Sequence, residues 1–324
     1  MQKRLPVLVI AAVSALALSG CTTSAEAGDD GRLQVVASTN VYGQLAAEIG
    51  GDRVDVASLI DSAEKDPHGY EATARDRLAV QKADLVIENG GGYDAFMQEL
   101  IDGSDATVIT AAEFSHDYPD AVVDDHDEHA DEPADTGAHA DEHEGHSHIE
   151  GFNEHVWFDV HTVSHLSEQI AADLTELDPA GEAEYAASAE KLTEELTGIE
   201  GELETLHEKL EGTPVFITEP LPGLLAAAAG LDDVAPDGFA SAVEEGNEVA
   251  PSVLLESLSL VAEGKVSAVL TTAQTGGSET DRVTDAAAQA DVPVVSFSEL
   301  LAADQSYAEW MRAAISDLAA ALGE

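Results

Sequence analysis

The sequence predicts an α/β fold made of two lobes, each with a mostly parallel sheet flanked by helices, joined by a long spine helix. In both halves, strand-sized apolar runs alternate with segments of helical apolar spacing, which is typical of βα units. Between the halves, residues 180–210 form a polar-rich helical segment, about 45 Å long at 1.5 Å rise per residue. The chain beyond residue 31 also exceeds the usual length of one domain, which favours two lobes.

The first 21 residues have the pattern of an export signal. Two basic residues precede an apolar run at 5–18, which is too short to span a ~30 Å hydrocarbon core as a helix. The run ends in Leu-Ser-Gly-Cys, which resembles the bacterial lipobox, where cleavage before the cysteine leaves a thiol that carries a lipid. Cys21 is the only cysteine of the chain, so an internal disulfide is excluded. We expect removal of residues 1–20, a lipid anchor at Cys21, a flexible tether over 21–31 and an extracytoplasmic protein anchored to the cell membrane.

The N-terminal lobe is expected over residues 32–178, with strands and helices in alternation. Thr73 looks like a helix cap, and a run of three glycines reads as a turn from strand to helix. The expected strands are 33–38, 54–60, 84–88 and 106–110, and the expected helices are 40–49, 74–83, 93–101 and 162–177.

A connecting helix is expected within residues 179–211. The C-terminal lobe, at 212–324, is again expected to alternate strands and helices. The expected strands are 215–218, 266–271 and 292–297, and the expected helices are 221–229, 251–263, 280–290 and 307–322.

The charge of the chain restricts its partners. The formal net charge is −52, from 65 acidic and 13 basic residues. Because phosphate binding needs clustered Lys and Arg, this charge argues against nucleic acid and favours cationic ligands. Adaptation of the surface to high salt is an alternative source of the diffuse acidic excess, but it does not explain where the histidines lie.

Histidines are concentrated in the acidic segment between His116 and Glu150. This segment holds seven histidines and thirteen acids without Lys or Arg, and we expect a disordered or mobile loop over 117–148. Imidazole suits zinc-like ions, so the loop is predicted to offer weak, exchangeable sites. The accessory histidines are His126, His129, His139, His143, His146 and His148.

A structured site is expected at the carboxyl ends of parallel strands, where open α/β sheets place their ligands. Four side chains qualify, two in each lobe: His68, His155, Glu219 and Glu299. Each by itself is more simply explained as a surface histidine or as an acid that begins a helix. Together, two imidazoles and two carboxylates that face one cleft would be enough to enclose Zn²⁺ or Mn²⁺.

A further histidine pair, His161 and His165, is spaced i, i+4 on an expected helix. This spacing could place both rings on one face. Because the first histidine is not followed by Glu, the pair is not the zinc-protease pattern, and a second metal site is the less favoured interpretation.

Several motifs together resemble the solute-binding lipoproteins of zinc and manganese ABC importers, the cluster A-I or cluster 9 family. They are the lipobox, Pro-His-x-Tyr-Glu at 67–71, the His-rich acidic insert and His-Val-Trp-Phe-Asp at 155–159. The resemblance covers essentially the whole mature chain. It implies that His68 and His155 are ligands from the first lobe and that Glu219 and Glu299 occupy the third and fourth ligand positions. It also implies a rigid helical spine between the lobes.

Two departures from the family pattern concern the choice of metal. Zinc importers of this family usually have His at the third position, whereas Glu219 looks like manganese-binding members, and the fourth ligand is usually Asp rather than Glu. Two carboxylates shift preference toward Mn²⁺, while the His-rich insert indicates zinc. Zinc is the favoured cargo and manganese the alternative.

The expected function is capture of a divalent transition metal outside the membrane and its delivery to the permease of an ABC importer by a monomeric binding protein. A metal-dependent hydrolase would need an open coordination position and a general base, for which the sequence offers no obvious spare residue. A surface adhesin is the alternative from another functional class.

Overall fold

The computed structural model describes residues 31–62, 65, 69–119, 149, 151–274 and 276–324. Residues 32–324 form one compact unit. Some sequence predictions lie outside the described residues: the signal peptide, Cys21, His68 and the six accessory loop histidines. No helix among the described residues is long and apolar enough to cross a membrane.

The first sheet contains four parallel strands in the order β2-β1-β3-β4. Its strands are β1 (Leu33–Thr39), β2 (Val54–Ile60), β3 (Leu85–Glu88) and β4 (Thr107–Thr110). The helices of this half are α1 (Asn40–Gly50), α2 (Ala74–Val80), α3 (Phe96–Ile101) and α4 (Val160–Leu177).

The second sheet has the same topology, with four parallel strands in the order β6-β5-β7-β8. Its strands are β5 (Thr213–Ile217), β6 (Leu231–Asp233), β7 (Ala268–Thr272) and β8 (Val294–Phe297). The helices are α6 (Gly223–Ala228), α7 (Phe239–Glu244), α8 (Pro251–Ala262), α9 (Ser278–Gln289) and α10 (Tyr307–Leu322). The predicted α/β fold with two mostly parallel sheets is confirmed.

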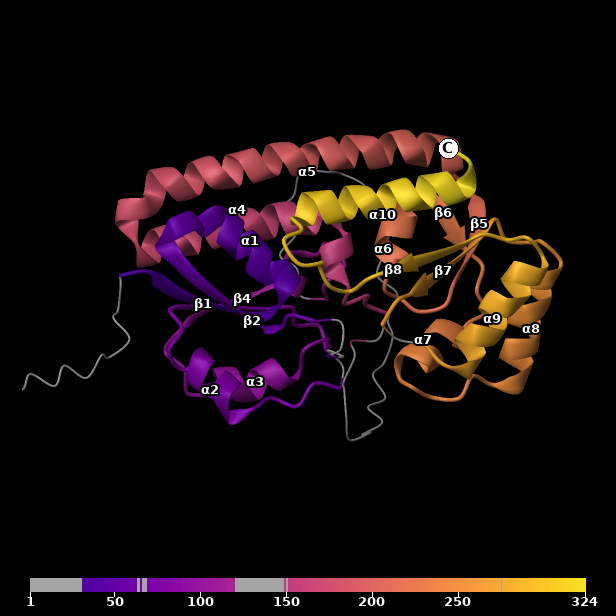
Figure 1. Ribbon diagram of the computed structural model, residues 1–324, viewed down its shortest axis with the longest axis horizontal. Coiled ribbons are helices and arrows are strands. Elements are labelled where there is room, and N and C mark those ends of the chain that lie inside the picture. The colour runs from indigo at the N-terminus through magenta and orange to yellow at the C-terminus, as the bar shows by residue number, and fades with distance from the viewer. Residues whose placement is uncertain (1–30, 63–64, 66–68, 120–148, 150, 275) are drawn as a thin grey trace, which may run out of the picture. The chain divides into compact units, whose positions relative to one another are not determined.

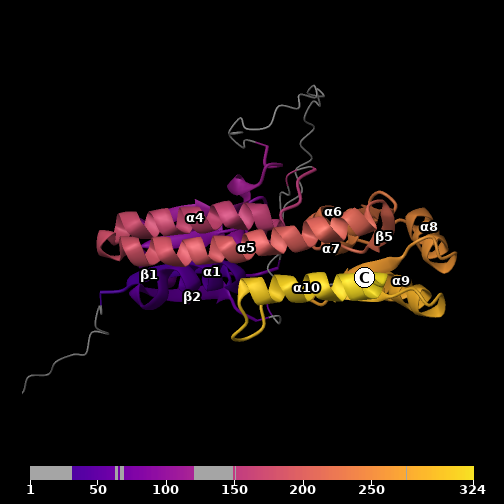
Figure 2. The same cartoon turned by 90° about the horizontal axis from the view of Figure 1, so that it is seen from above.

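The predicted spine is the helix α5 (Glu182–Leu210), which passes along both halves (Figure 1). Its 29 residues correspond to about 44 Å. In the view from above, α4 and α10 lie alongside it (Figure 2). Its buried side chains repeat at alternating intervals of four and three residues: Tyr185, Ala189, Leu192, Leu196, Ile199, Leu203, Leu206 and Leu210. This is a narrow seam of the coiled-coil type, which lets a charged helix bury a single stripe along its whole length.

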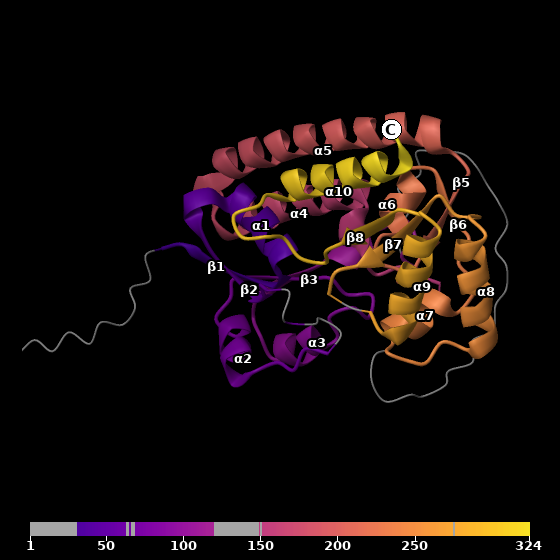
Figure 3. The same cartoon turned by 45° about the vertical axis from the view of Figure 1, so that its right-hand side comes forward.

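Successive side chains of each strand point to opposite faces of its sheet, and the buried ones gather in three hydrophobic cores. In β5, Val215 and Ile217 point into a core shared with the first sheet and α5, whereas Phe216 points to the opposite face, as the two-residue period of a strand requires. That opposite face is covered by α7, α8 and α9 (Figure 3), and the corresponding face of the first sheet is covered by α2 and α3. The shared core joins the two sheets through one continuous cluster.

Besides shifts of one to three residues at the ends of several elements, such as the predicted helix at 74–83 that ends at Val80, the structure differs from the sequence predictions in three short segments. The expected helix at 93–101 begins only at Phe96, because the Asp94 carboxylate accepts hydrogen bonds from the backbone N–H groups of Asn89 and Gly90 and so holds the preceding glycines in a turn. The strand β6 and the helix α7 were not predicted. Both are short, with three and six residues, which is too few for a periodic pattern to be recognised.

Candidate metal site

The two glutamates of the second sheet follow β5 and β8, the two strands on either side of β7. Glu219 lies two residues after the end of β5 and is 4% exposed, and Glu299 lies two residues after the end of β8 and is 2% exposed. The strand β7 pairs with both β5 and β8, and the hydroxyl of its last residue, Thr272, donates to Glu219 Oε2 at 3.3 Å. The sheet topology therefore brings both carboxylates to one buried edge, as the strand order implies.

His155 approaches from the segment that leads into α4. It immediately precedes a 3-10 turn at Val156–Phe158 and is 2% exposed. Its ring makes an edge contact with Tyr93, with centroids 5.7 Å apart, and the Tyr93 hydroxyl donates to Glu299 Oε2 at 3.1 Å. Tyr93 thus lies between the histidine of the first half and a glutamate of the second.

The Tyr93 side chain is buried and lies beside the negative charge of Glu299. Burial, followed by the nearby charge of Glu299, raises the pKa of Tyr93 well above its ordinary value. The phenol therefore stays protonated at physiological pH and donates its proton to the carboxylate. This hydrogen bond orients Glu299 without adding a second negative charge.

Asn153 determines which nitrogen of His155 faces the site. Its side-chain NH2 donates to the Pro220 carbonyl at 2.9 Å, which leaves its oxygen 2.9 Å from His155 Nδ1. Because an amide oxygen only accepts, the ring must donate its Nδ1–H, and the lone pair of the neutral imidazole is then on Nε2. The same Asn153 contacts the residue next to Glu219, so it couples His155 to the segment that carries Glu219.

Two carboxylates that the sequence did not predict as ligands lie beside His155. Glu244 Oε1 is 3.7 Å from His155 Nε2, and Glu154, His155 and Glu244 each place a ligand-type atom within 4.8 Å of the others. Glu154 is 2% exposed, and Glu244 is the last residue of α7. Glu154 could have been noticed as the neighbour of His155. Glu244 gave no signal, because the helix that carries it was not predicted.

The arrangement gathers negative charge and one imidazole in a buried region between the two sheets. Glu154, Glu219 and Glu299 are each less than 5% exposed, and burying ionised carboxylates is costly unless cations or hydrogen bonds offset their charge. Imidazole nitrogen with carboxylate oxygen is a donor set for divalent transition metals. The donor chemistry of these described residues therefore fits a divalent cation.

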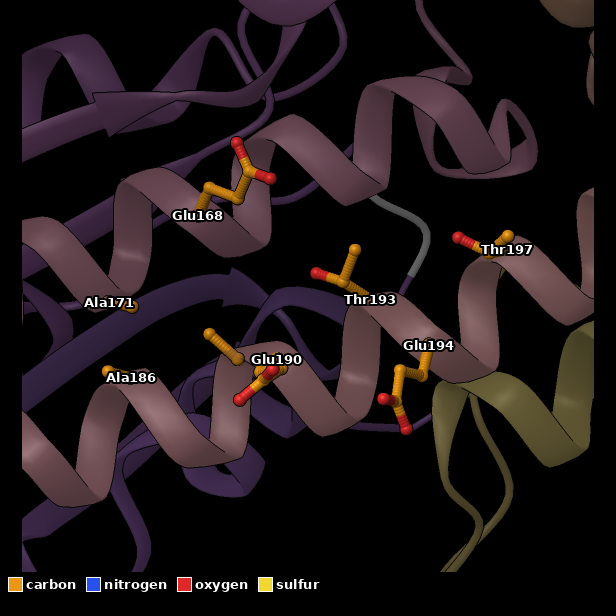
Figure 4. Close-up of a pocket in the computed structure, with 8 residues that line it drawn as sticks. Glu168, Ala171, Ala186, Glu190, Thr193, Glu194 and Thr197 are labelled. Atoms are coloured by element: carbon orange, nitrogen blue, oxygen red, sulfur yellow. The ribbon is translucent and has the colours of Figure 1, made fainter.

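Three of the four predicted ligands lie within the described residues. His155, Glu219 and Glu299 all lie at the junction of the two halves, linked through Tyr93 and Asn153, while His68 lies outside the described residues. The groove between α4 and α5 shown in Figure 4 is a separate feature, lined by side chains such as Glu168, Glu190 and Glu194, and contains none of these ligands.

Comparison with known proteins gives one family for nearly the whole chain. Residues 35–321 match the family described as zinc-uptake complex component A, periplasmic. The manganese-binding lipoprotein MntA of Halalkalibacterium halodurans is 28% identical over 232 residues, which are 68% of this chain and 67% of the relative. The zinc-binding lipoprotein AdcA of Streptococcus pneumoniae is 26% identical over 189 residues, 57% of this chain and 35% of that relative. This chain thus spans about a third of AdcA.

Solved structures share the fold at lower identity. The periplasmic zinc-binding protein TroA of Treponema pallidum superposes with a TM-score of 0.69 at 19% identity and covers 91% of this chain and 100% of its own. The binding protein FpvC of Pseudomonas aeruginosa, solved with Mn²⁺, gives 0.67 at 22% identity, with 90% and 98% covered. With the family model matched over residues 35–321, the chain belongs to the zinc-uptake complex component A family, a family of solute-binding transport proteins and not of enzymes.

Proposed function

We propose that this protein captures a divalent transition metal, with zinc favoured, between its two halves and delivers it to the permease of an ABC importer. The observation that carries the proposal is that His155, Glu219 and Glu299 are buried at the junction of the two sheets, linked through Tyr93 and Asn153, and that Glu154 and Glu244 place carboxylates beside His155. Relatives named as a manganese-binding lipoprotein, a zinc-binding lipoprotein and a metal ABC transporter substrate-binding lipoprotein support the same role. We further propose an extracytoplasmic monomer held at the membrane by a lipid on Cys21.

In the proposed site, His68 and His155 supply nitrogen and Glu219 and Glu299 supply oxygen. The Nε2 lone pair of His155 is the one directed to the cargo, since Nδ1 is held by Asn153. Glu244 of the second half lies 3.7 Å from that nitrogen and is a further candidate ligand. Four protein ligands would enclose the ion without an open position for water, as suits a carrier rather than a catalyst.

Manganese is the second candidate cargo, and specific observations favour it. Carboxylate oxygens suit Mn²⁺ better than imidazole does, and here the carboxylates Glu154, Glu219, Glu244 and Glu299 outnumber the single described imidazole of the site. MntA, a relative at 28% identity, is named as manganese-binding. Zinc nevertheless remains the favoured cargo, because the histidine-rich insert offers many imidazoles, which suit zinc better than manganese.

Elemental mass spectrometry after competition of equal Zn²⁺ and Mn²⁺ for metal-stripped protein tests the proposal. The chain to be used has its six accessory loop histidines and the exposed His161 and His165 replaced by Gln, so that metal on these residues does not obscure the count. We expect one equivalent of zinc to remain and Glu219→Gln or Glu299→Gln to release it. Glu244→Gln is expected to weaken binding, whereas Glu245→Gln, its exposed neighbour, should have no effect.

Other results of this experiment would contradict either the choice of zinc or the interlobe site. One equivalent of manganese in place of zinc would overturn the zinc assignment and retain the site. Metal lost together with the loop histidines, or metal kept in Glu219→Gln and Glu299→Gln, would overturn the interlobe site itself.

A further inference from the structure

A pair of exposed imidazoles on α4 lies outside the proposed interlobe site. His161 Nε2 and His165 Nε2 are 3.2 Å apart, and the ring planes are nearly perpendicular at 88° with centroids 4.6 Å apart. The side chains are 64% and 50% exposed. Because i, i+4 positions share one face of a helix, the helix itself holds the two nitrogens together.

The spacing of the two Nε2 atoms is that of two ligands on one tetrahedral ion. With zinc–nitrogen bonds of about 2.05 Å and a tetrahedral angle, two bound imidazole nitrogens lie about 3.3 Å apart. The pair would therefore accept a metal with little rearrangement of the rings. A direct hydrogen bond between the two rings would give the same distance, so the tautomers decide between the two interpretations.

The carboxylates behind the rings favour the metal-binding tautomers. His161 Nδ1 is 3.7 Å from Glu200 Oε1 on α5, and His165 Nδ1 is 3.9 Å from Glu168 Oε2 on α4. These contacts are longer than hydrogen bonds, but the negative charge behind each ring favours a proton on Nδ1. With both protons there, two Nε2 lone pairs face each other, and a shared cation relieves their repulsion. A carboxylate behind each imidazole is also the arrangement that orients histidine ligands of metals.

We propose that His161 and His165 form a second, exchangeable site for a zinc-class ion, on the exposed face of α4. Two imidazoles suit Zn²⁺, Ni²⁺ and Cu²⁺ and discriminate against Mn²⁺, Mg²⁺ and Ca²⁺, which prefer oxygen. With two protein ligands the other positions remain open to water, so exchange is fast and affinity lower than at an enclosed site. Glu168, which lies 3.9 Å from His165 Nδ1, also lines the acidic groove between α4 and α5 together with Glu190 and Glu194 (Figure 4). These carboxylates raise the local concentration of cations.

Residue-resolved chemical modification tests the site in the full chain, despite the other histidines. Diethylpyrocarbonate attacks the free imidazole lone pair, and peptide mass spectrometry reports the rate at each histidine. With buffered excess Zn²⁺, we expect His161 and His165 to react about tenfold more slowly, because the bound ion occupies both lone pairs. The exposed His207, whose Nδ1 is 3.1 Å from the Ala228 carbonyl oxygen, is the internal control, and Mn²⁺ at the same concentration should protect neither residue of the pair.

The decisive variant is His165→Gln, in which His161 must lose its protection by zinc. Glu176→Gln, on the same helix, is the matched control and should leave the protection intact. Protection of His161 that persists in His165→Gln, equal protection by Mn²⁺, or the absence of protection at any zinc concentration would each overturn the proposal. Protection in Glu219→Gln must be unchanged, so failure here is distinguishable from failure of the interlobe site.

Discussion

At the scale of single residues, Asn153 has the most consequential position in the candidate site. Its oxygen selects the tautomer of His155, and its NH2 group is bonded to the Pro220 carbonyl beside Glu219. One amide therefore orients a ligand from the first half and anchors the segment that carries a ligand from the second. Such outer partners of a metal ligand fix its orientation and raise its basicity.

Replacing Asn153 by Ala is expected to lower zinc affinity by about 10–100-fold, the usual cost of losing a partner of a ligand. Asn153→Asp keeps an acceptor for His155 Nδ1 and loses the bond to Pro220, so it should lose less. Titration against a chromophoric zinc chelator measures both. Asn247→Ala, at an exposed amide that contacts Glu245, is the control. Unchanged affinity in folded Asn153→Ala protein would show that His155 is not a ligand or needs no such support.

At the scale of helices and strands, α5 combines a continuous apolar seam with two interior glycines, although most of its other residues are strong helix formers such as Ala, Glu and Leu. The helix contains Gly198 and Gly201 on its exposed side. Glycine in a helix interior is unfavourable relative to alanine because the unfolded chain has more conformational freedom to lose. The two glycines are therefore local weak points in a helix that is stabilised by its packing against both halves as well as by the helix preference of its other residues.

Gly201→Ala is accordingly expected to raise the free energy of unfolding by about 0.5–1 kcal/mol. A Cβ at Gly201 would meet no atom within 4 Å, so the gain in propensity carries no steric cost. Gly43→Ala in the buried part of α1 is the contrast, because there the new Cβ would lie 2.1 Å from Ser58 Oγ. Urea midpoints of both variants measure the effects. A destabilised Gly201→Ala would mean that the bend allowed by this glycine is needed by the native packing.

The sequence predicted the long elements with a clear periodic pattern and missed the shortest ones. The expected helix at 307–322 coincides with α10, and the strand at 54–60 coincides with β2, because both have clear patterns and sharp ends. The three-residue β6 depends on its pairing with β5, and the six-residue α7 on tertiary contacts such as those of Phe239 with Phe216. For that reason Glu244 could not be predicted, whereas Glu219 and Glu299 could be placed by counting from strands.

At the scale of the whole described unit, the two halves share one core and several direct hydrogen bonds. Asn40 Nδ2 donates to the Leu301 carbonyl at 2.9 Å, and the Leu301 N–H donates back to Asn40 Oδ1 at 3.1 Å. The Tyr307 hydroxyl donates to the Trp157 carbonyl at 2.8 Å. The seam of α5 belongs to the same cluster as the inner faces of both sheets. A wide opening of the halves would have to break these contacts together.

We therefore expect capture and release of the cargo with little relative movement of the halves. Hinge motion needs a few residues that absorb large changes of backbone angles, whereas α5 crosses the junction as uninterrupted helix. Spin labels at Asp102→Cys and Asp285→Cys, both exposed and on opposite halves, in a Cys21→Ser chain, report the distance by pulsed electron resonance. Its most populated value should shift by no more than about 2 Å between metal-stripped and zinc-loaded protein, as for packed elements that slide. A second, well-separated distance in the stripped protein would show that the shared core parts on release, and the exchange of metal would then have to be explained by domain opening rather than by local movement of Glu244 and its neighbours.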